Sequence, residues 1–124
     1  MKFVASEKAA AAVGPYSQAT VVDGKVIFIS GQLPMNMETG ELETDVEKAT
    51  QACLNALEAI ITEAGGTKEN LAKLTVLVTD IGDFSKINNV YADFFGDHKP
   101  ARALYEVAAL PKGAVIEIEA YGVL

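Results

Sequence analysis

The chain has 124 residues, 50% of them hydrophobic, and a formal net charge of −7. A chain of this length can bury about two thirds of its unfolded surface, and we expect a single domain over residues 1–124. The acidic balance argues against nucleic acids and anionic membranes as partners, because both require a basic protein face. No stretch has the length and apolarity of a transmembrane helix.

The counts of reactive side chains exclude several kinds of site. His98 is the only histidine and Cys53 the only cysteine, so a zinc cluster and an intramolecular disulfide are excluded. Acidic residues are dispersed and a Gly-rich phosphate loop is absent, so we expect no metal and no nucleotide cofactor. The single thiol and the lack of a signal-peptide pattern are typical of a cytoplasmic protein.

The first part of the chain predicts strands. We expect a short edge strand at residues 3–4 and two longer strands at 19–22 and 25–29. The dipeptide Asp23-Gly24 between the longer two strongly favours a β-hairpin. The sequence therefore predicts that strands 19–22 and 25–29 pair with each other.

The middle of the chain predicts two helices around a strand. A capping box at Thr44-Asp45-Val46-Glu47 begins the first helix, which ends at Gly65-Gly66. Residues 74–79 have the composition of a strand. Asp83 caps the second helix and Gly96 ends it. The apolar residues at helical spacing are Val46, Ala49, Cys53, Leu57, Ile60 and Ala64 in the first helix and Phe84, Ile87, Tyr91 and Phe94 in the second.

The end of the chain predicts two more strands, at 101–108 and 115–121, joined by a turn near Pro111. The resulting order is strand, strand, strand, helix, strand, helix, strand, strand, which is typical of a two-layer α+β fold. Residues 26–29 and 74–78 are apolar at odd and even positions alike, so both sheet faces should be buried. Two helices can cover only one face, and we therefore expect an obligate homo-oligomer with sites between subunits.

Arg102 is the only arginine among ten basic side chains. A guanidinium can hold a carboxylate through two parallel hydrogen bonds, which a lysine cannot do. If the last two strands form a hairpin, Arg102 lies opposite Glu119 and diagonal to Glu117, at about 7–8 Å. This arrangement predicts a site for a small carboxylate, with a structural ion pair as the alternative; a one-residue slip in register would abolish it.

Five segments carry a family resemblance. They are Gly14-Pro15-Tyr16-Ser17-Gln18, Ile29-Ser30-Gly31-Gln32-Leu33-Pro34, Asn88-Asn89-Val90-Tyr91-Ala92-Asp93-Phe94-Phe95, Pro100-Ala101-Arg102-Ala103-Leu104, and Val107-Ala108-Ala109-Leu110-Pro111-Lys112 with Ile116-Glu117-Ile118-Glu119-Ala120. In this order and at this spacing, the chain resembles the reactive-intermediate deaminase family (RidA/YjgF-type imine and enamine deaminases) along nearly its whole length.

The resemblance implies a homotrimer of chorismate-mutase-like subunits, with the sheets around a central barrel and a site at each interface. It also implies hydrolysis of 2-aminoacrylate-type enamines and their imine tautomers to 2-oxo acids and ammonia, without a cofactor. Arg102 would hold the substrate carboxylate and Glu117 would activate water. The remaining implied substrate-binding positions are Tyr16, Ser30, Gly31, Asn88 and Leu104.

At the level of sequence, one departure from the family leaves the size of the pocket open, and one alternative to an enzyme stays open. Leu104 stands where the family often carries cysteine, which excludes a thiol switch there and adds bulk to the pocket. A non-enzymatic trimer that binds small carboxylates as a regulator or acts like a chaperone would need Arg102 but not Glu117. Ribonuclease activity is disfavoured by the acidic charge and by the lack of a histidine pair for acid–base work on a phosphodiester.

Overall fold

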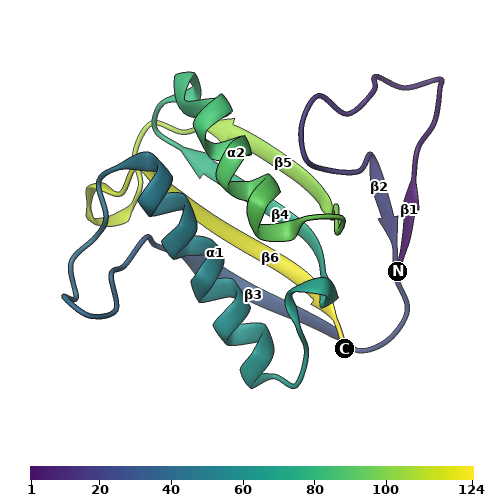
Figure 1. Cartoon of the computed structure of the whole chain (residues 1–124), viewed down its shortest axis with the longest axis horizontal. Coiled ribbons are helices and arrows are strands. Elements are labelled where there is room, and N and C mark those ends of the chain that lie inside the picture. The colour runs from purple at the N-terminus through teal and green to yellow at the C-terminus, as the bar shows by residue number, and fades with distance from the viewer.

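The computed structural model describes all residues, 1–124. The strands are β1 (Lys2–Val4), β2 (Ala19–Val21), β3 (Val26–Gln32), β4 (Leu71–Val78), β5 (Ala101–Glu106) and β6 (Ile116–Val123). The helices are α1 (Val46–Glu63) and α2 (Phe84–Phe95), with short 3-10 turns at Lys68–Asn70, Ile81–Asp83 and Pro111–Gly113. Figure 1 shows these elements along the chain. Their order is the predicted one, and the α+β fold class is confirmed.

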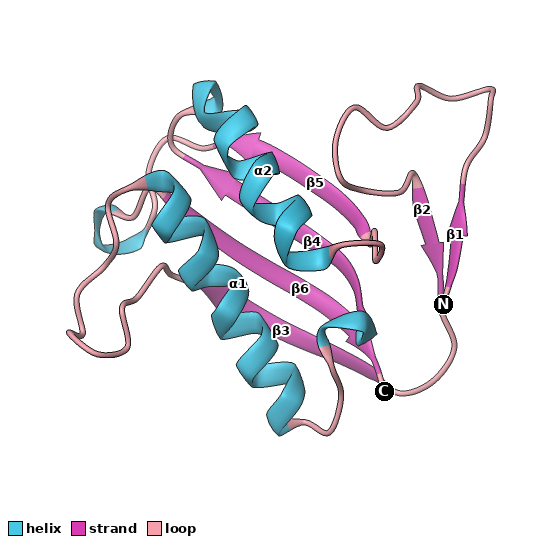
Figure 2. Ribbon diagram, viewed as in Figure 1, coloured by secondary structure: helices cyan, strands magenta, loops and turns pink.

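The main sheet has the strand order β3-β6-β4-β5, and β1 pairs with β2 in a separate two-stranded sheet. Strand β4 is parallel to β5 and antiparallel to β6, and β6 is antiparallel to β3. Both helices lie on one face of the four-stranded sheet (Figure 2). None of the helices has the length and apolarity that crossing a membrane requires.

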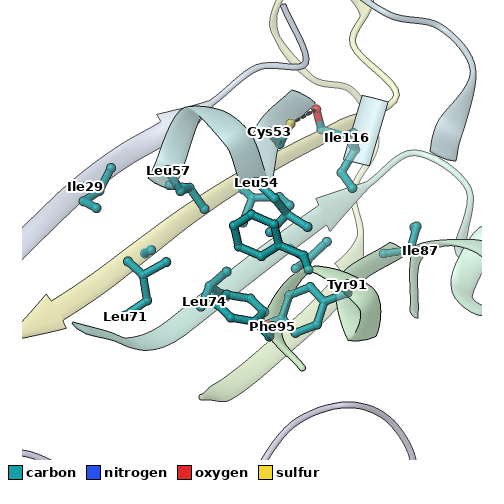
Figure 3. Packing of buried hydrophobic residues seen from close by; sticks show 14 of the residues in the cluster. Ile29, Cys53, Leu54, Leu57, Leu71, Leu74, Ile87, Tyr91, Phe95 and Ile116 are labelled. Carbon is teal, nitrogen blue, oxygen red and sulfur yellow. Dashed lines mark hydrogen bonds between the residues drawn. The ribbon is translucent and has the colours of Figure 1, made fainter. Parts of the chain in front are cut away.

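The hydrophobic core lies between the two helices and the sheet. Asp45, one residue into the predicted capping box, begins α1 by accepting a hydrogen bond from the backbone N–H of Lys48 at 3.0 Å. After Ala64 the chain turns at Gly65, whose φ of 98° suits glycine. The buried stripes of α1 and α2 pack on alternate residues of β4 and β6 (Figure 3). Cys53 is fully buried in this core, as its place in the helical stripe predicts.

The predicted hairpin of residues 19–29 is wrong. β2 pairs with β1, with Phe3 opposite Thr20, whereas β3 pairs with β6. Two hydrogen bonds join the backbones of Lys25 and Leu124, at 3.1 and 2.8 Å, so the end of the chain takes the position of the expected partner. Gly24, with φ 129°, brings its backbone so close that a Cβ would lie 2.6 Å from the Leu124 carbonyl oxygen. The Asp23-Gly24 turn therefore leads from one sheet into the other.

The predicted hairpin of the last two strands is also wrong, because β4 lies between β5 and β6. Leu74 is opposite Arg102, and Thr75 is opposite Glu119. A strand that is apolar at nearly every position is most stable inside a sheet, and β4 is such a strand, with α2 as the crossover to the parallel β5. The pairing of Arg102 with Glu119 that the hairpin predicted is therefore absent.

The face of the sheet opposite the helices carries the side chains of Phe28, Leu77, Glu117, Glu119 and Tyr121, and we call it the open face. Phe28 is 74% exposed there, with its ring 5.3 Å from that of Tyr121. The helices thus cover one face only, as predicted, and the other presents large apolar groups. Isolated apolar residues are common on protein surfaces, but a sheet face of this kind favours a protein partner.

Candidate active site

Arg102 is held by aromatic rings and one amide, and by no acid. Its Nη1 donates a hydrogen bond of 2.7 Å to Asn88 Oδ1. The guanidinium carbon lies 4.9 Å from the ring centre of Tyr91, 5.1 Å from that of Tyr16 and 5.8 Å from that of Phe84. No Asp or Glu oxygen lies within 4.0 Å to form a salt bridge with it. This half-buried cation therefore lacks an anionic partner within the chain.

Helix α2 supplies most of the side chains that contact Arg102. Phe84, Asn88 and Tyr91 recur at helical spacing, so all three lie on the face of α2 directed toward β5. Tyr16 comes from the loop before β2, which is anchored along β5 by a bridge between Ser17 and Ala101. We call Arg102, Asn88, Tyr16, Phe84 and Tyr91 the guanidinium cluster.

Gly14 fits into the guanidinium cluster because it has no side chain. A Cβ on Gly14 would lie 3.1 Å from Arg102 Nη2, 3.3 Å from Asn88 Nδ2 and 3.4 Å from the Tyr16 ring. Contacts of 3.1 Å and 3.3 Å are tighter than nine in ten real Cβ contacts, so with a larger residue the guanidinium and the amide would have to move by a few tenths of an ångström. The Gly14-Pro15-Tyr16 segment thus sets how closely the loop approaches Arg102.

The electrostatics of the guanidinium cluster favour an anionic ligand. Burial lowers the pKa of Arg102, while Tyr91 and Tyr16 act in the opposite direction. A charged group that has lost hydration without gaining a counter-ion gains the most from a bound anion. Because Asn88 occupies only one guanidinium N–H, the others can donate to a carboxylate.

Glu117 belongs to a second group of residues, around β3 and β6. Its carboxylate lies against Gly31, so closely that a Cβ on this glycine would overlap it. Ser30, next to Gly31, is exposed, and its carbonyl accepts a 3.0 Å hydrogen bond from Gln32 Nε2.

Burial, with a contribution from Glu117, raises the pKa of Cys53 to about 12, so this thiol stays protonated and is a poor nucleophile.

The two groups lie on opposite faces of the sheet. Arg102 shares a face with its neighbour Leu74 on the helix side, while Glu117 shares the open face with Leu77. Leu74 and Leu77 differ by an odd number of positions in β4, so their side chains point in opposite directions. The prediction that Arg102 and Glu117 are diagonal neighbours on one face is therefore wrong.

The other predicted site residues divide between these groups. Tyr16 and Asn88 contact Arg102, Gly31 lies against Glu117, and Ser30 precedes Gly31 in β3. Leu104 is opposite Val76 on the helix side and packs against the core. A cavity of about 990 Å³ between α1 and the loop after β3 is lined by neither Arg102 nor Glu117.

Sequence reasoning missed Phe84, Tyr91 and Gly14 as members of the guanidinium cluster. Phe84 is predicted only as part of the apolar face of the second helix, and Tyr91 as part of that face and of a resembling segment, without a role in the site. Their spacing from Asn88 was the available signal, because it places them on the face of the helix that presents this amide. Gly14 lay inside a resembling segment but had no separate signal.

Comparisons with known proteins agree with this fold. The family model described as Endoribonuclease L-PSP matches residues 6–124. RutC family protein y4sK of Sinorhizobium fredii is 53% identical over 94% of this chain and 93% of that protein. The 2-iminobutanoate/2-iminopropanoate deaminase of Capra hircus is 50% identical over 98% of this chain and 89% of that protein.

Solved structures give the same result. RidA from the Antarctic bacterium Psychrobacter sp. PAMC 21119 superposes with a TM-score of 0.78 and 40% identity, over 100% of both chains. E. coli TdcF with bound serine superposes with a TM-score of 0.77 and 38% identity, over 100% of this chain and 99% of that one. With a family match that begins at residue 6 and reaches the last residue, the chain belongs to the Endoribonuclease L-PSP family, the family of the RidA and YjgF proteins.

Proposed function

We propose that this protein hydrolyses reactive 2-aminoacrylate-type enamines and their imine tautomers to 2-oxo acids and ammonia. The observation that carries the proposal is Arg102, a half-buried cation with free N–H donors and no acid within 4.0 Å. The name of the Capra hircus relative, at 50% identity, supplies the substrate class. A 2-imino acid has the carboxylate that such a guanidinium binds.

Arg102 holds the substrate carboxylate, and the guanidinium cluster fixes the orientation of the guanidinium. Asn88 occupies one N–H and the Tyr16 ring lies on the guanidinium, so a carboxylate approaches donors that are already fixed in direction. Leu104 follows on the same face of β5 and borders the same region. Its side chain, larger than a cysteine, favours small 2-imino acids over large ones.

Glu117 is the acid–base group of the proposed reaction. The enamine first takes up a proton at its terminal carbon and becomes the iminium form of the imine. Glu117 then accepts a proton from water as the water oxygen bonds to the iminium carbon, which gives a carbinolamine. Glu117 passes this proton to nitrogen, and it takes up the hydroxyl proton as the carbon–oxygen double bond forms and the carbon–nitrogen bond breaks. The products are a 2-oxo acid and ammonia, and the net reaction consumes one water. The Gly31 backbone lies beside Glu117 and Ser30 is the preceding, exposed residue of β3, so both can orient the water or the substrate.

The two groups of residues meet between subunits. Because Arg102 and Glu117 lie on opposite faces of one sheet, a single chain cannot present both to one substrate. In a homotrimer, the open face of one copy is covered by its neighbour, and Glu117 of one copy meets Arg102 of another. The exposed Phe28 and Tyr121 supply apolar area for this contact. The site thus depends on assembly.

The test is the rate of ammonia and 2-oxo acid release from 2-iminobutanoate generated enzymatically, compared among wild type, Arg102→Ala and Glu117→Gln. We expect acceleration by wild type, a large loss of kcat/KM in Arg102→Ala, and a loss of kcat in Glu117→Gln with carboxylate affinity retained. An assembled wild-type protein that does not exceed spontaneous hydrolysis would refute the proposal for this substrate.

A second candidate is a trimer that binds small carboxylates without turning them over. It is favoured by the solved E. coli TdcF structure, which has bound serine. The two candidates predict different effects of Glu117→Gln. A binding protein keeps its carboxylate affinity in this variant, whereas an enzyme keeps that affinity and loses turnover. The family description mentions ribonuclease activity, but a net charge of −7 provides no favourable surface for RNA.

A further inference from the structure

Tyr91 carries a hydroxyl group that the folded chain does not use. The residue lies in α2 with 0% of its surface exposed, packed in the core between helix and sheet (Figure 3). Its hydroxyl is the only buried side-chain nitrogen or oxygen in the structure without a hydrogen-bond partner. A buried hydroxyl normally has a partner, because it has given up hydrogen bonds to water.

Packing alone does not explain the hydroxyl. The Tyr91 ring contacts that of Phe95, with centroids 4.9 Å apart, and it lies among apolar core residues, with the Arg102 guanidinium over the ring. A phenylalanine would fill the same space and make the same ring contacts. The oxygen therefore opposes folding, and a role in the bound state accounts for its presence.

The surroundings of Tyr91 identify the ligand that would use it. The guanidinium carbon of Arg102 lies 4.9 Å from its ring centre, the shortest of the three ring contacts that Arg102 makes. Arg102 is also the one charged group that acts on the Tyr91 pKa, which burial raises, so the hydroxyl keeps its proton and can donate it. Asn88 holds the guanidinium by a single hydrogen bond, so the guanidinium can shift slightly within its plane while the rings keep its orientation.

We propose that the Tyr91 hydroxyl is a substrate-binding group, which donates a hydrogen bond to the carboxylate that Arg102 holds. The oxygen is covered in the unliganded chain, and a small shift of the guanidinium on taking up the anion brings a carboxylate oxygen to it. The missing hydrogen bond is then completed only in the complex. This inference rests on the proposed function, because it assigns Tyr91 to the same carboxylate site.

The test compares wild type and Tyr91→Phe, as assembled proteins, for binding of 2-oxobutanoate by isothermal titration calorimetry. We expect the affinity to fall by about 10- to 100-fold, as for the loss of one hydrogen bond to a charged group. The thermal unfolding temperature should stay the same or rise, because the variant removes an unpaired buried hydroxyl. Tyr105→Phe is the matched control, since Tyr105 is exposed and lies on the other face of β5.

Arg102→Ala distinguishes failure of this inference from failure of the site. If Arg102→Ala weakens binding and Tyr91→Phe does not, Tyr91 has no part in the site and the inference is overturned. If Arg102→Ala binds 2-oxobutanoate as tightly as wild type does, the carboxylate site itself is wrong, and the inference fails with it. Weaker binding in Tyr91→Phe together with a lower unfolding temperature would assign the hydroxyl a structural role and also overturn the inference.

Discussion

Replacing Arg102 with lysine keeps the positive charge but removes the planar arrangement of N–H donors. The guanidinium presents parallel donors to a carboxylate while Nη1 remains bonded to Asn88. A lysine ammonium lacks the planar pair of parallel donors that binds a carboxylate in two places, and it stacks less well on Tyr16 and Tyr91. Arg102→Lys therefore tests whether the planar fork, rather than positive charge alone, holds the substrate.

The expected loss of kcat/KM follows from the hydrogen bonds between Arg102 and the substrate carboxylate. A hydrogen bond to a charged group contributes about 1.5–3 kcal/mol, and the variant loses roughly one of them in the complex. A loss of about 2 kcal/mol corresponds to about a 30-fold fall in kcat/KM. Since the contact holds the substrate before and during the reaction, KM should rise more than kcat falls.

Arg102→Met is the matched stability control. It fills the space among the three rings without a charge, and the wild-type cation is half-buried without a counter-ion. We therefore expect an unfolding temperature equal to or above that of wild type, together with loss of carboxylate binding. The assays are deamination of 2-iminobutanoate and thermal unfolding of the same preparations. Two results would refute this account of Arg102: a kcat/KM of Arg102→Lys equal to that of wild type, or an Arg102→Met protein that does not fold.

Three further predictions concern the open face and the core. Gly31→Ala should lower kcat of the deaminase assay about as much as Glu117→Gln does, because the new methyl group displaces the Glu117 carboxylate; unchanged kcat would contradict this contact. Phe28→Lys should leave the subunit folded by circular dichroism but shift light scattering toward monomer, since Phe28 is 74% exposed in the single chain; a monomeric wild type would contradict the proposed assembly. Burial raises the Cys53 pKa from 9.0 to about 12, so the folded chain keeps this proton after the unfolded chain has lost it. The free energy of unfolding in urea should then fall between pH 9 and 12 by up to about 1.4 kcal/mol per unit, and Cys53→Ala should lack this part of the slope.

The order of the elements could be predicted because its signals are local. Helical spacing in α1 and α2 and apolar runs in β3 and β4 depend only on neighbouring residues. Strand pairing depends on competition among distant segments, and here it failed twice. The Asp23-Gly24 signal was outweighed when the last residues of the chain paired with β3, and the short connection between β5 and β6 was outweighed by the burial of β4 between them.

The candidate site was predictable in part for the same reason. Arg102, Tyr16 and Asn88 lie together as the resemblance implied. The motifs of a family indicate which residues share a site even where the pairing of the strands is predicted wrongly. Phe84 and Tyr91 were hidden, since an aromatic residue that contacts a guanidinium has the same spacing as one that only fills the core. The unpaired hydroxyl of Tyr91 became visible only in three dimensions.

The wrong register prediction changes where the reaction can occur. A hairpin of β5 and β6 would have put Arg102 and Glu117 on one face, and a monomer could then hold a complete site. With β4 between them, the two side chains point to opposite faces, and a slip of one residue would expose the apolar stripe of β4 to water. The core thus fixes the separation of the two groups within a chain. If both act on one substrate, they come from different copies, and activity must fall when dilution separates the subunits.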